Sequence, residues 1–310
     1  MNPLLSIVIA NYNYGRFLEA AIKSVVEQVI GDEGGGMRDK VELIICDAAS
    51  TDNSVDIIKK YAAGLPPNTH RSEWNSPSSI PDSSSPIPHP SSLITWWCSE
   101  KDKGQSDAFN KGFAHARGRL GCWVNADDLL LPGTIKAVID YMTAHPKCEW
   151  ITGGMVFFDS DEKVMWMRLG MQPWSRMWRW MPGWCIGGPS SFFSIEKLRM
   201  VGGFDLERYY SMDIDLWYKL FRYGLRPHHI NRYFWGFRAH DASKTAHTLK
   251  ASMGEAMQRE KLRLFEVYGL SAWKIKIGSF ALKLSGVLGG SLVRSYWDSW
   301  RYGKKPIQCV

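Results

Sequence analysis

The chain of 310 residues lacks the patterns that identify several common classes of enzyme. No Gly-x-Gly-x-x-Gly follows its first apolar run, and no Walker A sequence occurs, so a dinucleotide oxidoreductase and a P-loop nucleotidase lose their main support. Its six cysteines show no Cys-x-x-Cys spacing. Since most of them lie in apolar runs, we expect buried free thiols rather than disulfides or zinc ligands.

Membrane-spanning and secretory segments are also missing. No run of about 20 apolar residues predicts a transmembrane helix, and the N-terminus does not resemble a signal peptide. We therefore expect a cytoplasmic protein. A net charge of +7 favours anionic partners such as nucleotide phosphates or an anionic membrane. Because the positive charge is dispersed, with no long Lys/Arg run, we expect no nucleic-acid partner.

What the sequence does contain is a repeated alternation of strand-like and helix-like segments. Short apolar, β-branched runs are followed by polar turns and then by segments with helical periodicity. This alternation predicts an α/β protein with a largely parallel sheet. The predicted strands are 4–10, 41–46, 93–97, 120–124 and 150–158, and the predicted helices are 16–28, 54–62, 105–117 and 133–144.

Two carboxylates, Asp127 and Asp128, come directly after the apolar run 120–124. Such a pair at the end of a buried strand is tolerated if a cation or a hydrogen-bond network compensates the charge. Carboxylate oxygens suit Mg²⁺ or Mn²⁺, which commonly share their ligand shell with substrate phosphates. The pair predicts a metal–diphosphate site at the carboxyl end of the sheet, with capping of the next helix as the alternative.

Residues 99–112, Ser-Glu-Lys-Asp-Lys-Gly-Gln-Ser-Asp-Ala-Phe-Asn-Lys-Gly, are followed by Asn-Ala-Asp-Asp at 125–128. Together with Gly-Gly-Phe-Asp at 202–205, they resemble bacterial glycosyltransferases of family 2. The resemblance implies the GT-A fold, in which a mixed, mostly parallel sheet is flanked by helices as in nucleotide-diphospho-sugar transferases. We expect that domain to occupy residues 1–246.

The same resemblance implies an inverting, metal-dependent transfer of a sugar from a nucleoside-diphosphate sugar to an acceptor hydroxyl. The expected acceptor is a glycan or a lipid-linked molecule, in cell-envelope or exopolysaccharide synthesis. Two other classes stay open. A sugar-nucleotide pyrophosphorylase shares the α/β nucleotide fold, but its Gly-rich activation loop is missing here. The second open class is a non-catalytic sugar-binding or membrane-associated protein.

For the donor, the resemblance implies that Ala10 and Tyr12 line the nucleotide base, with Tyr12 stacked on it, and that Asp47 accepts a hydrogen bond from base or ribose. The remaining nucleotide-binding residues that it implies are Glu100, Asp107, Lys111 and Asp127. For Asp107 a helix-capping role is compatible with this one, and for Lys111 a solvated side chain is the alternative. The family more often shows Asp-Gly-Ser-Thr-Asp where this chain has Asp-Ala-Ala-Ser-Thr-Asp at 47–52.

For catalysis, the resemblance implies that Asp213 is the base, with Asp215 as the alternative. The family pattern is often Glu-Asp, whereas this chain has Met212 before Asp213, and a helix cap is the other explanation. Asp127 and Asp128 would hold Mn²⁺ or Mg²⁺. His240 is a candidate third ligand or diphosphate contact.

Tryptophans gather between residues 173 and 184, where Trp178, Trp180 and Trp184 accompany two arginines. Trp and Arg are typical of contact surfaces, so we predict acceptor or membrane contact, with core packing as the alternative.

Two segments depart from the α/β pattern. Residues 76–92 contain 13 Ser or Pro among 17, so we expect a surface loop over 70–92 without a catalytic role. Residues 247–310 form a predicted basic, amphipathic helical tail. Its stretch 273–297 mixes lysines with apolar residues, which fits peripheral contact at the inner face of the cell membrane or packing on the domain or a second subunit. No pattern predicts the oligomeric state.

Overall fold

The structure is a computed structural model, and by its contacts the chain divides into two compact units. Unit 1 comprises residues 1–146 and 193–196, and unit 2 comprises residues 147–192 and 197–310. The expected division into 1–246 and 247–310 stays a prediction. The structure describes residues 2–31, 36–62, 65, 67–68, 93–170, 186–241, 243 and 251–310, without the side chains of 251–253.

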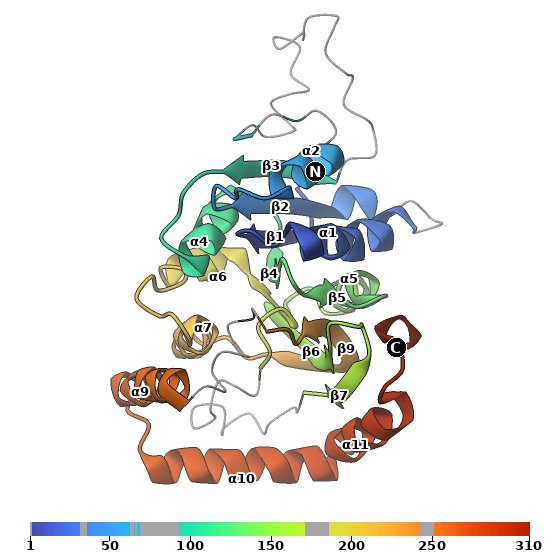
Figure 1. The fold of residues 1–310 in the computed structure, drawn as a ribbon. Coiled ribbons are helices and arrows are strands. Elements are labelled where there is room, and N and C mark those ends of the chain that lie inside the picture. The colour runs from blue at the N-terminus through green and yellow to red at the C-terminus, as the bar shows by residue number, and fades with distance from the viewer. Residues whose placement is uncertain are drawn as a thin grey trace, which may run out of the picture. The chain divides into compact units, whose positions relative to one another are not determined.

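Unit 1 contains four parallel strands in the order β3-β2-β1-β4 (Figure 1). Its elements are β1 (Leu5–Asn11), α1 (Gly15–Ile30), β2 (Val41–Asp47), α2 (Ser54–Ala62), β3 (Ile94–Ser99), α4 (Gln105–His115), β4 (Leu120–Asn125), β5 (Leu129–Leu130) and α5 (Thr134–Ala144). All the strands and helices expected in this unit are present. The parallel register brings the carboxyl ends of the strands to one edge, where Asp47 pairs with Asn11 and with Ser99.

Two glycines, one in helix α4 and one in the turn after it, let this segment lie directly on the sheet. A Cβ atom on Gly112 would collide with Val8, and one on Gly118 would lie 2.6 Å from the backbone nitrogen of Ser6. The helix ends at His115, two residues earlier than expected, because Ala116 is already extended. Aromatic side chains fill the space below it, with the rings of Phe109 and Trp123 5.6 Å apart.

Unit 1 also buries an acid that the sequence did not suggest. Glu42, in the middle of β2, is almost fully buried. Its carboxylate accepts hydrogen bonds from the hydroxyl of Ser6 at 2.6 Å and from the backbone of Arg117 at 2.6 Å, and it pairs with the Arg117 guanidinium at 3.0 Å. A buried carboxylate is tolerated when it is paired and hydrogen-bonded in this way. Glu42 therefore ties the turn after α4 to the sheet.

In unit 2, the long strand β6 pairs with β7 antiparallel and with β9 parallel. The elements that lie in it wholly or in part are β6 (Trp150–Phe158), β7 (Val164–Arg168), β8 (Ser191–Ser194), α6 (Ile195–Met200), α7 (Met212–Arg222), β9 (His228–Arg238), α9 (Ala251–Val267), α10 (Ala272–Leu288) and α11 (Ser291–Tyr302). Helix α7 packs through Trp217, whose ring lies 5.2 Å from that of Trp150. With the antiparallel pairing of β8 to β4, the pairings of the two units are mixed but mostly parallel, as expected.

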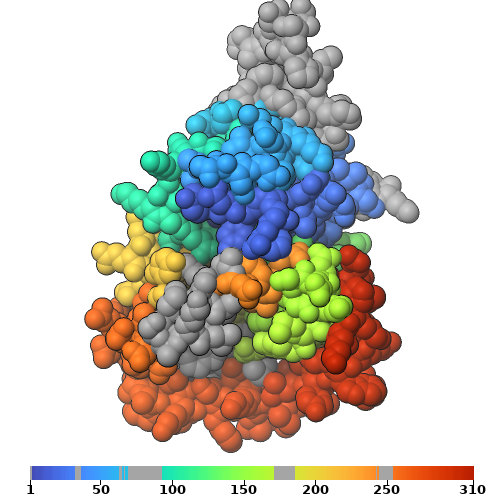
Figure 2. Space-filling model, in the orientation of Figure 1, coloured from blue at the N-terminus to red at the C-terminus, as the bar shows by residue number. Residues whose placement is uncertain are grey.

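The C-terminal segment packs within unit 2. Helix α11 follows α10 and lies beside β7 in Figure 1, and Figure 2 shows the light-green residues of β7 bordering the red C-terminal residues. The hydroxyls of Ser295 and Ser299 accept hydrogen bonds from the backbone of β7 and of the residue after it, each at 2.8 Å. The chain then forms a short bridge to Lys163 through Pro306. In the part of the chain that the structure describes, no helix has both the length and the apolarity to cross a bilayer.

Candidate active site

The carboxyl edge of the unit 1 sheet is organised by Asp47, which is 1% exposed. One of its oxygens accepts hydrogen bonds from the amide of Asn11 at 2.7 Å and from the hydroxyl of Ser50. The other accepts from the backbone of Ser50 at 3.0 Å and from the hydroxyl of Ser99 at 2.6 Å. An ionised carboxylate offers about four acceptor positions, and four protein donors occupy them here. Asp47 thus joins the ends of β1, β2 and β3.

The loops after β1 and β2 are also bound to each other. The backbone N–H of Asn13 donates to Ser50 at 2.8 Å, and the Asn13 side chain accepts from the backbone of Thr51 at 2.8 Å. Ala49 adopts a left-handed conformation with φ of 57°. The family pattern has glycine immediately before Ser-Thr-Asp, and glycine takes this conformation without steric cost. The loop therefore keeps, with alanine, a backbone shape that favours glycine.

Tyr12 lies between Asn11 and Asn13, where the loops after β1 and β2 are hydrogen-bonded to each other, and it is 59% exposed. Its two neighbours are fixed by the hydrogen bonds described above. Ala10 is half-buried at the end of β1. An exposed aromatic ring on a fixed backbone suits stacking on a planar ligand.

The acidic turn after β4 is linked to the start of α4 through Asn125. The side chain of Gln105 donates to Asn125 at 2.8 Å, and Asn125 donates to Asp128 at 2.7 Å. Asp128 is 1% exposed, whereas Asp127 is half-buried. Of the two expected metal ligands, Asp128 is therefore engaged with the protein, and Asp127 is the more accessible.

The segment before α4 carries a lysine between carboxylates. The ammonium of Lys111 lies 3.2 Å from Glu100 and 3.8 Å from Asp107. Partial burial lowers the pKa of Lys111, but the hydrogen bond to Glu100 and the negative charges of Glu100 and Asp107 together outweigh it and leave the pKa raised. Asp107 also accepts from the backbone of Lys103 at 3.0 Å, which ties the first turn of α4 to the residue before its N-cap, Gly104. Burial raises the pKa of Asp102 in the same segment.

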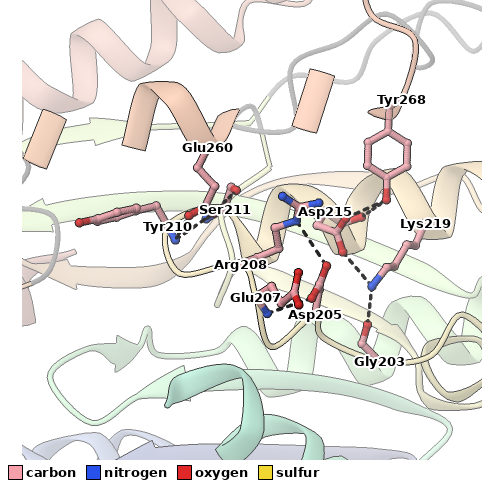
Figure 3. A network of polar contacts seen from close by, with 10 residues as sticks. All are labelled: Gly203, Asp205, Glu207, Arg208, Tyr210, Ser211, Asp215, Lys219, Glu260 and Tyr268. Carbon is pink, nitrogen blue, oxygen red and sulfur yellow. Dashed lines mark hydrogen bonds and ion pairs between the residues drawn. The ribbon is translucent and has the colours of Figure 1, made fainter. Parts of the chain in front are cut away.

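In unit 2, the two candidate bases on α7 have different surroundings, and Figure 3 shows those of Asp215. Asp215 is 3% exposed and accepts a hydrogen bond from the hydroxyl of Tyr268 at 2.8 Å. Its other oxygen lies 2.8 Å from the Lys219 ammonium. Burial raises the pKa of Tyr268, and the Asp215 charge raises it further. Asp213 is half-buried, and its carboxylate accepts the backbone N–H of Ile214 at 2.8 Å.

The start of α7 is held by an acid from α9 that the sequence analysis missed. Glu260 accepts hydrogen bonds from the backbone of Tyr210 at 3.1 Å and of Ser211 at 2.9 Å, and from the Ser211 hydroxyl (Figure 3). A carboxylate at a helix N-terminus is favoured by the helix dipole. No local pattern in the sequence connects Ser211 to an acid 49 residues away.

His240, the candidate third ligand, lies in unit 2, and so do Asp205 and Arg238; His240 and Arg238 are buried. Asp205 accepts from the backbone of Glu207 at 2.9 Å and shapes the turn that carries it. Arg238 is buried and pairs with Glu162 at 3.1 Å, and His240 is buried beside the end of β9. Trp178, Trp180 and Trp184 lie outside the described residues. Among the residues that are described, no group of three His, Cys, Asp or Glu side chains is arranged to hold a metal.

Comparison with known proteins identifies relatives of the chain. The model of the family described as Glycosyl transferase family 2 matches residues 6–75 and 97–198, more than half of the chain. An uncharacterized glycosyltransferase of Nostoc sp. is 31% identical over 136 residues, which make up 44% of this chain and 32% of that protein. The chain therefore spans about a third of this relative's length.

Two relatives come from Bacillus subtilis. The putative glycosyltransferase EpsE is 24% identical over 235 residues, which cover 74% of this chain and 70% of EpsE. The minor teichoic acid biosynthesis protein GgaB is 26% identical over 153 residues, covering 49% of this chain and 13% of GgaB.

Solved structures share the fold. Residues 1–349 of S. aureus TarS in complex with UDP-GlcNAc give a TM-score of 0.56 at 14% identity, covering 83% of this chain and 65% of that chain. The mannosyltransferase PcManGT from Pyrobaculum calidifontis, in complex with GDP-Man and Mn²⁺, gives 0.55 at 17% identity, covering 93% and 76%. At these identities the likeness concerns the fold alone. The expected GT-A fold is confirmed.

Proposed function

Because the chain belongs to glycosyl transferase family 2, we propose that it transfers a sugar from a nucleoside-diphosphate sugar to an acceptor hydroxyl. One observation carries the proposal beyond family membership. The carboxyl edge of the unit 1 sheet holds an exposed aromatic ring, Tyr12, and an acidic turn with the accessible Asp127. Ligands of open α/β sheets bind at this edge.

On the nucleotide side, Tyr12 stacks on the base, and the half-buried Ala10 lines it. Asp47 shapes the binding loop, because its four acceptor positions are filled by Asn11, Ser50 and Ser99. A ribose hydroxyl that reached Asp47 would replace one of these donors, and the exchangeable one is the Ser99 hydroxyl at the end of β3. The nucleoside therefore meets a loop that is already ordered, which lowers the entropic cost of binding.

We place the diphosphate at the acidic turn. Asp127 and Asp128 fit a divalent cation that takes its remaining ligands from phosphate oxygens and water, which is how Mg²⁺ usually binds. When bound there, Mn²⁺ or Mg²⁺ stabilises the charge that develops on the leaving diphosphate. The Mn²⁺ in the PcManGT complex supports this assignment. Lys111, held between Glu100 and Asp107, adds positive charge to the donor segment. A role for His240 as a further ligand stays a prediction.

For the chemical step we assign the general base to Asp213. The acceptor oxygen bonds to the anomeric carbon while the bond from that carbon to the diphosphate oxygen breaks, which inverts the configuration. Asp213 takes the hydroxyl proton. The observation that favours Asp213 over Asp215 is the commitment of Asp215 to Tyr268 and Lys219 inside the protein.

The acceptor is proposed to be a glycan or a lipid-linked molecule of the cell envelope. The name of GgaB, a minor teichoic acid biosynthesis protein, supports that class of acceptor. Whether the tryptophans of residues 173–184 contact it stays a prediction.

The proposal is tested by incubating the purified full-length chain with a panel of UDP- and GDP-sugars and measuring release of the nucleoside diphosphate. We expect one donor to be turned over in the presence of Mn²⁺ or Mg²⁺, and both chelator and Asp127→Asn to reduce the rate. Full activity with chelator would contradict the metal assignment but not the proposed sugar transfer. Failure to bind or turn over any donor would contradict the transfer, and pyrophosphate-dependent formation of a nucleotide sugar would identify a pyrophosphorylase.

A further inference from the structure

Helix α11 packs with its polar side toward the protein. Ser295, Ser299 and Asp298 face inward, where the serines accept backbone hydrogen bonds and Asp298 accepts one from the hydroxyl of Tyr233 at 2.7 Å. The opposite side carries Val293, Tyr296, Trp297 and Trp300, and Tyr296 and Trp300 are 81% and 73% exposed. A surface helix normally presents the reverse arrangement, with its apolar side packed and its polar side in water.

Helix α10 also exposes an apolar stripe. Its packed side consists of small or apolar residues, including Gly278, Ala281 and Leu282, which are buried. The exposed apolar residues are Trp273, Ile277, Phe280, Leu284, Val287 and Leu288. Their spacing of three and four positions places them along one side of the helix. The helix is therefore apolar on two sides, and only one of them is covered by the protein.

We call the exposed apolar residues of α10 and α11 the tail surface. A group of ten large apolar side chains in two adjoining helices is more than the scattered exposure common on soluble domains. Such surfaces mark contact with a protein or with a membrane. The two partners differ in the charge that they would meet.

The charge around the tail surface is positive. After Glu266 the only acidic residue of the chain is Asp298, while Lys and Arg occur seven times. Asp298 is buried against Tyr233 and lies 3.4 Å from Arg294. Helical periodicity places Lys276 and Lys283 along one border of the α10 stripe. A second copy docking by the same surface would bring these cations together, whereas an anionic bilayer would attract them.

We propose that the tail surface binds the face of an anionic lipid bilayer, with α10 and α11 lying in the interface. Aromatic and aliphatic side chains enter the boundary between headgroups and acyl chains, and the lysines remain among the headgroups. Trp and Tyr are the side chains favoured at that depth. The proposal is independent of the sugar-transfer activity, since it rests only on the packing, exposure and charge of the C-terminal helices.

The test is co-sedimentation of the full-length chain with vesicles of phosphatidylcholine alone and with vesicles of equal parts phosphatidylcholine and phosphatidylglycerol. We expect binding to the anionic vesicles that weakens with added salt, and much weaker binding to the neutral ones. The double variant Phe280→Ser/Trp300→Ser should bind at least about tenfold more weakly, because two large apolar side chains no longer enter the bilayer. The matched control Ile30→Ser changes an exposed apolar residue of α1 and should bind as the parent does.

The electrostatic contribution to vesicle binding is tested with a separate pair of variants. Lys276→Gln with Lys283→Gln should weaken binding to the anionic vesicles by about fivefold for each lysine, and Lys59→Gln with Lys136→Gln should not. Melting curves verify that each variant is folded. Absence of binding to the anionic vesicles would overturn the proposal. So would sedimentation velocity that shows a stable dimer which Phe280→Ser/Trp300→Ser dissociates, because the tail surface would then be an interface between copies.

Discussion

The sheet edge of unit 1 and the start of α7 in unit 2 each place a buried carboxylate near a more accessible one. At the sheet edge, Asp47 is buried and held by four donors, while Asp127 is half-buried in the acidic turn. On α7, Asp215 is buried against Tyr268 and Lys219, while Asp213 is half-buried. The comparison leads to a prediction for both regions: the buried carboxylate shapes the site, and the more exposed one meets the substrate.

The two regions differ in where the buried acid finds its partners. Asp47 is held by Asn11, Ser50 and Ser99, which lie at the ends of neighbouring strands or in the loop that follows. Asp215 is held by Lys219 on its own helix and by Tyr268, which follows α9. The start of α7 also depends on α9, through Glu260. The start of α7 therefore depends on residues of the C-terminal segment, whereas the donors found for Asp47 in the described part of the chain all come from unit 1.

The largest effect on stability is expected at Asp47. Replacing it by Leu leaves the donors of Asn11, Ser50 and Ser99 buried without an acceptor, which should cost about 4 kcal/mol of unfolding free energy. Denaturant unfolding measures the loss. Asp127→Asn is the matched control and should cost less than about 1 kcal/mol. If Asp47→Leu and the parent unfold at the same denaturant concentration, Asp47 does not shape the site, and the proposed division of roles between buried and more exposed carboxylates is wrong.

A smaller effect is expected at Tyr12, and it concerns the affinity for the nucleotide rather than the stability of the fold. Tyr12→Ala removes the stacking surface and should weaken binding of the nucleoside diphosphate by about tenfold, as expected for one stacked base. Tyr12→Phe keeps the ring and should bind as the parent does. Calorimetric titration measures both affinities, and unchanged binding by Tyr12→Ala would show that the base lies elsewhere. The melting temperature should not move, because the side chain is exposed.

The smallest effect is expected at Ala49. Ala49→Gly relieves the left-handed conformation but adds freedom to the unfolded chain, so we expect a net gain of about 0.5 kcal/mol. Ala48→Gly supplies the control, since Ala48 is not among the described residues with positive φ. It should lose about 0.5 kcal/mol through unfolded-state entropy alone. A loss for Ala49→Gly as large as that of the control would mean that the loop stores no strain.

Much of unit 1 was predictable from sequence because its signals are local. Strands β1, β2 and β4 are almost continuous apolar runs, and each polar turn follows directly after one of them. The carboxyl ends of parallel strands meet at one edge, so the pair Asp127 and Asp128 was expected there, while Asp47 was expected through the family resemblance. Glu42 was missed because its partner Arg117 lies 75 residues away.

Unit 2 was less predictable because its signals are distant or ambiguous. Strand β7 is short and almost wholly apolar, and its exposed Met165 and Trp166 give it no alternation of apolar and polar residues. The contacts of Glu260 and Tyr268 with α7 span about fifty residues and follow no motif. For residues 273–297, apolar periodicity alone could not separate packing from membrane contact. The structure shows that both sides of α10 are apolar and that one of them is exposed.

The most direct measurement is a single-turnover transfer assay on Asp213→Asn and Asp215→Asn, run with a melting curve for each. Asp213→Asn should lower the transfer rate by about 10²–10⁴-fold, because the amide cannot take the acceptor proton, and should melt as the parent does. Asp215→Asn should melt at a lower temperature, with a loss of about 2 kcal/mol of unfolding free energy, because Lys219 loses its counter-charge. While folded, it should transfer sugar at close to the parental rate. A parental rate for Asp213→Asn together with an inactive, normally melting Asp215→Asn would contradict the account.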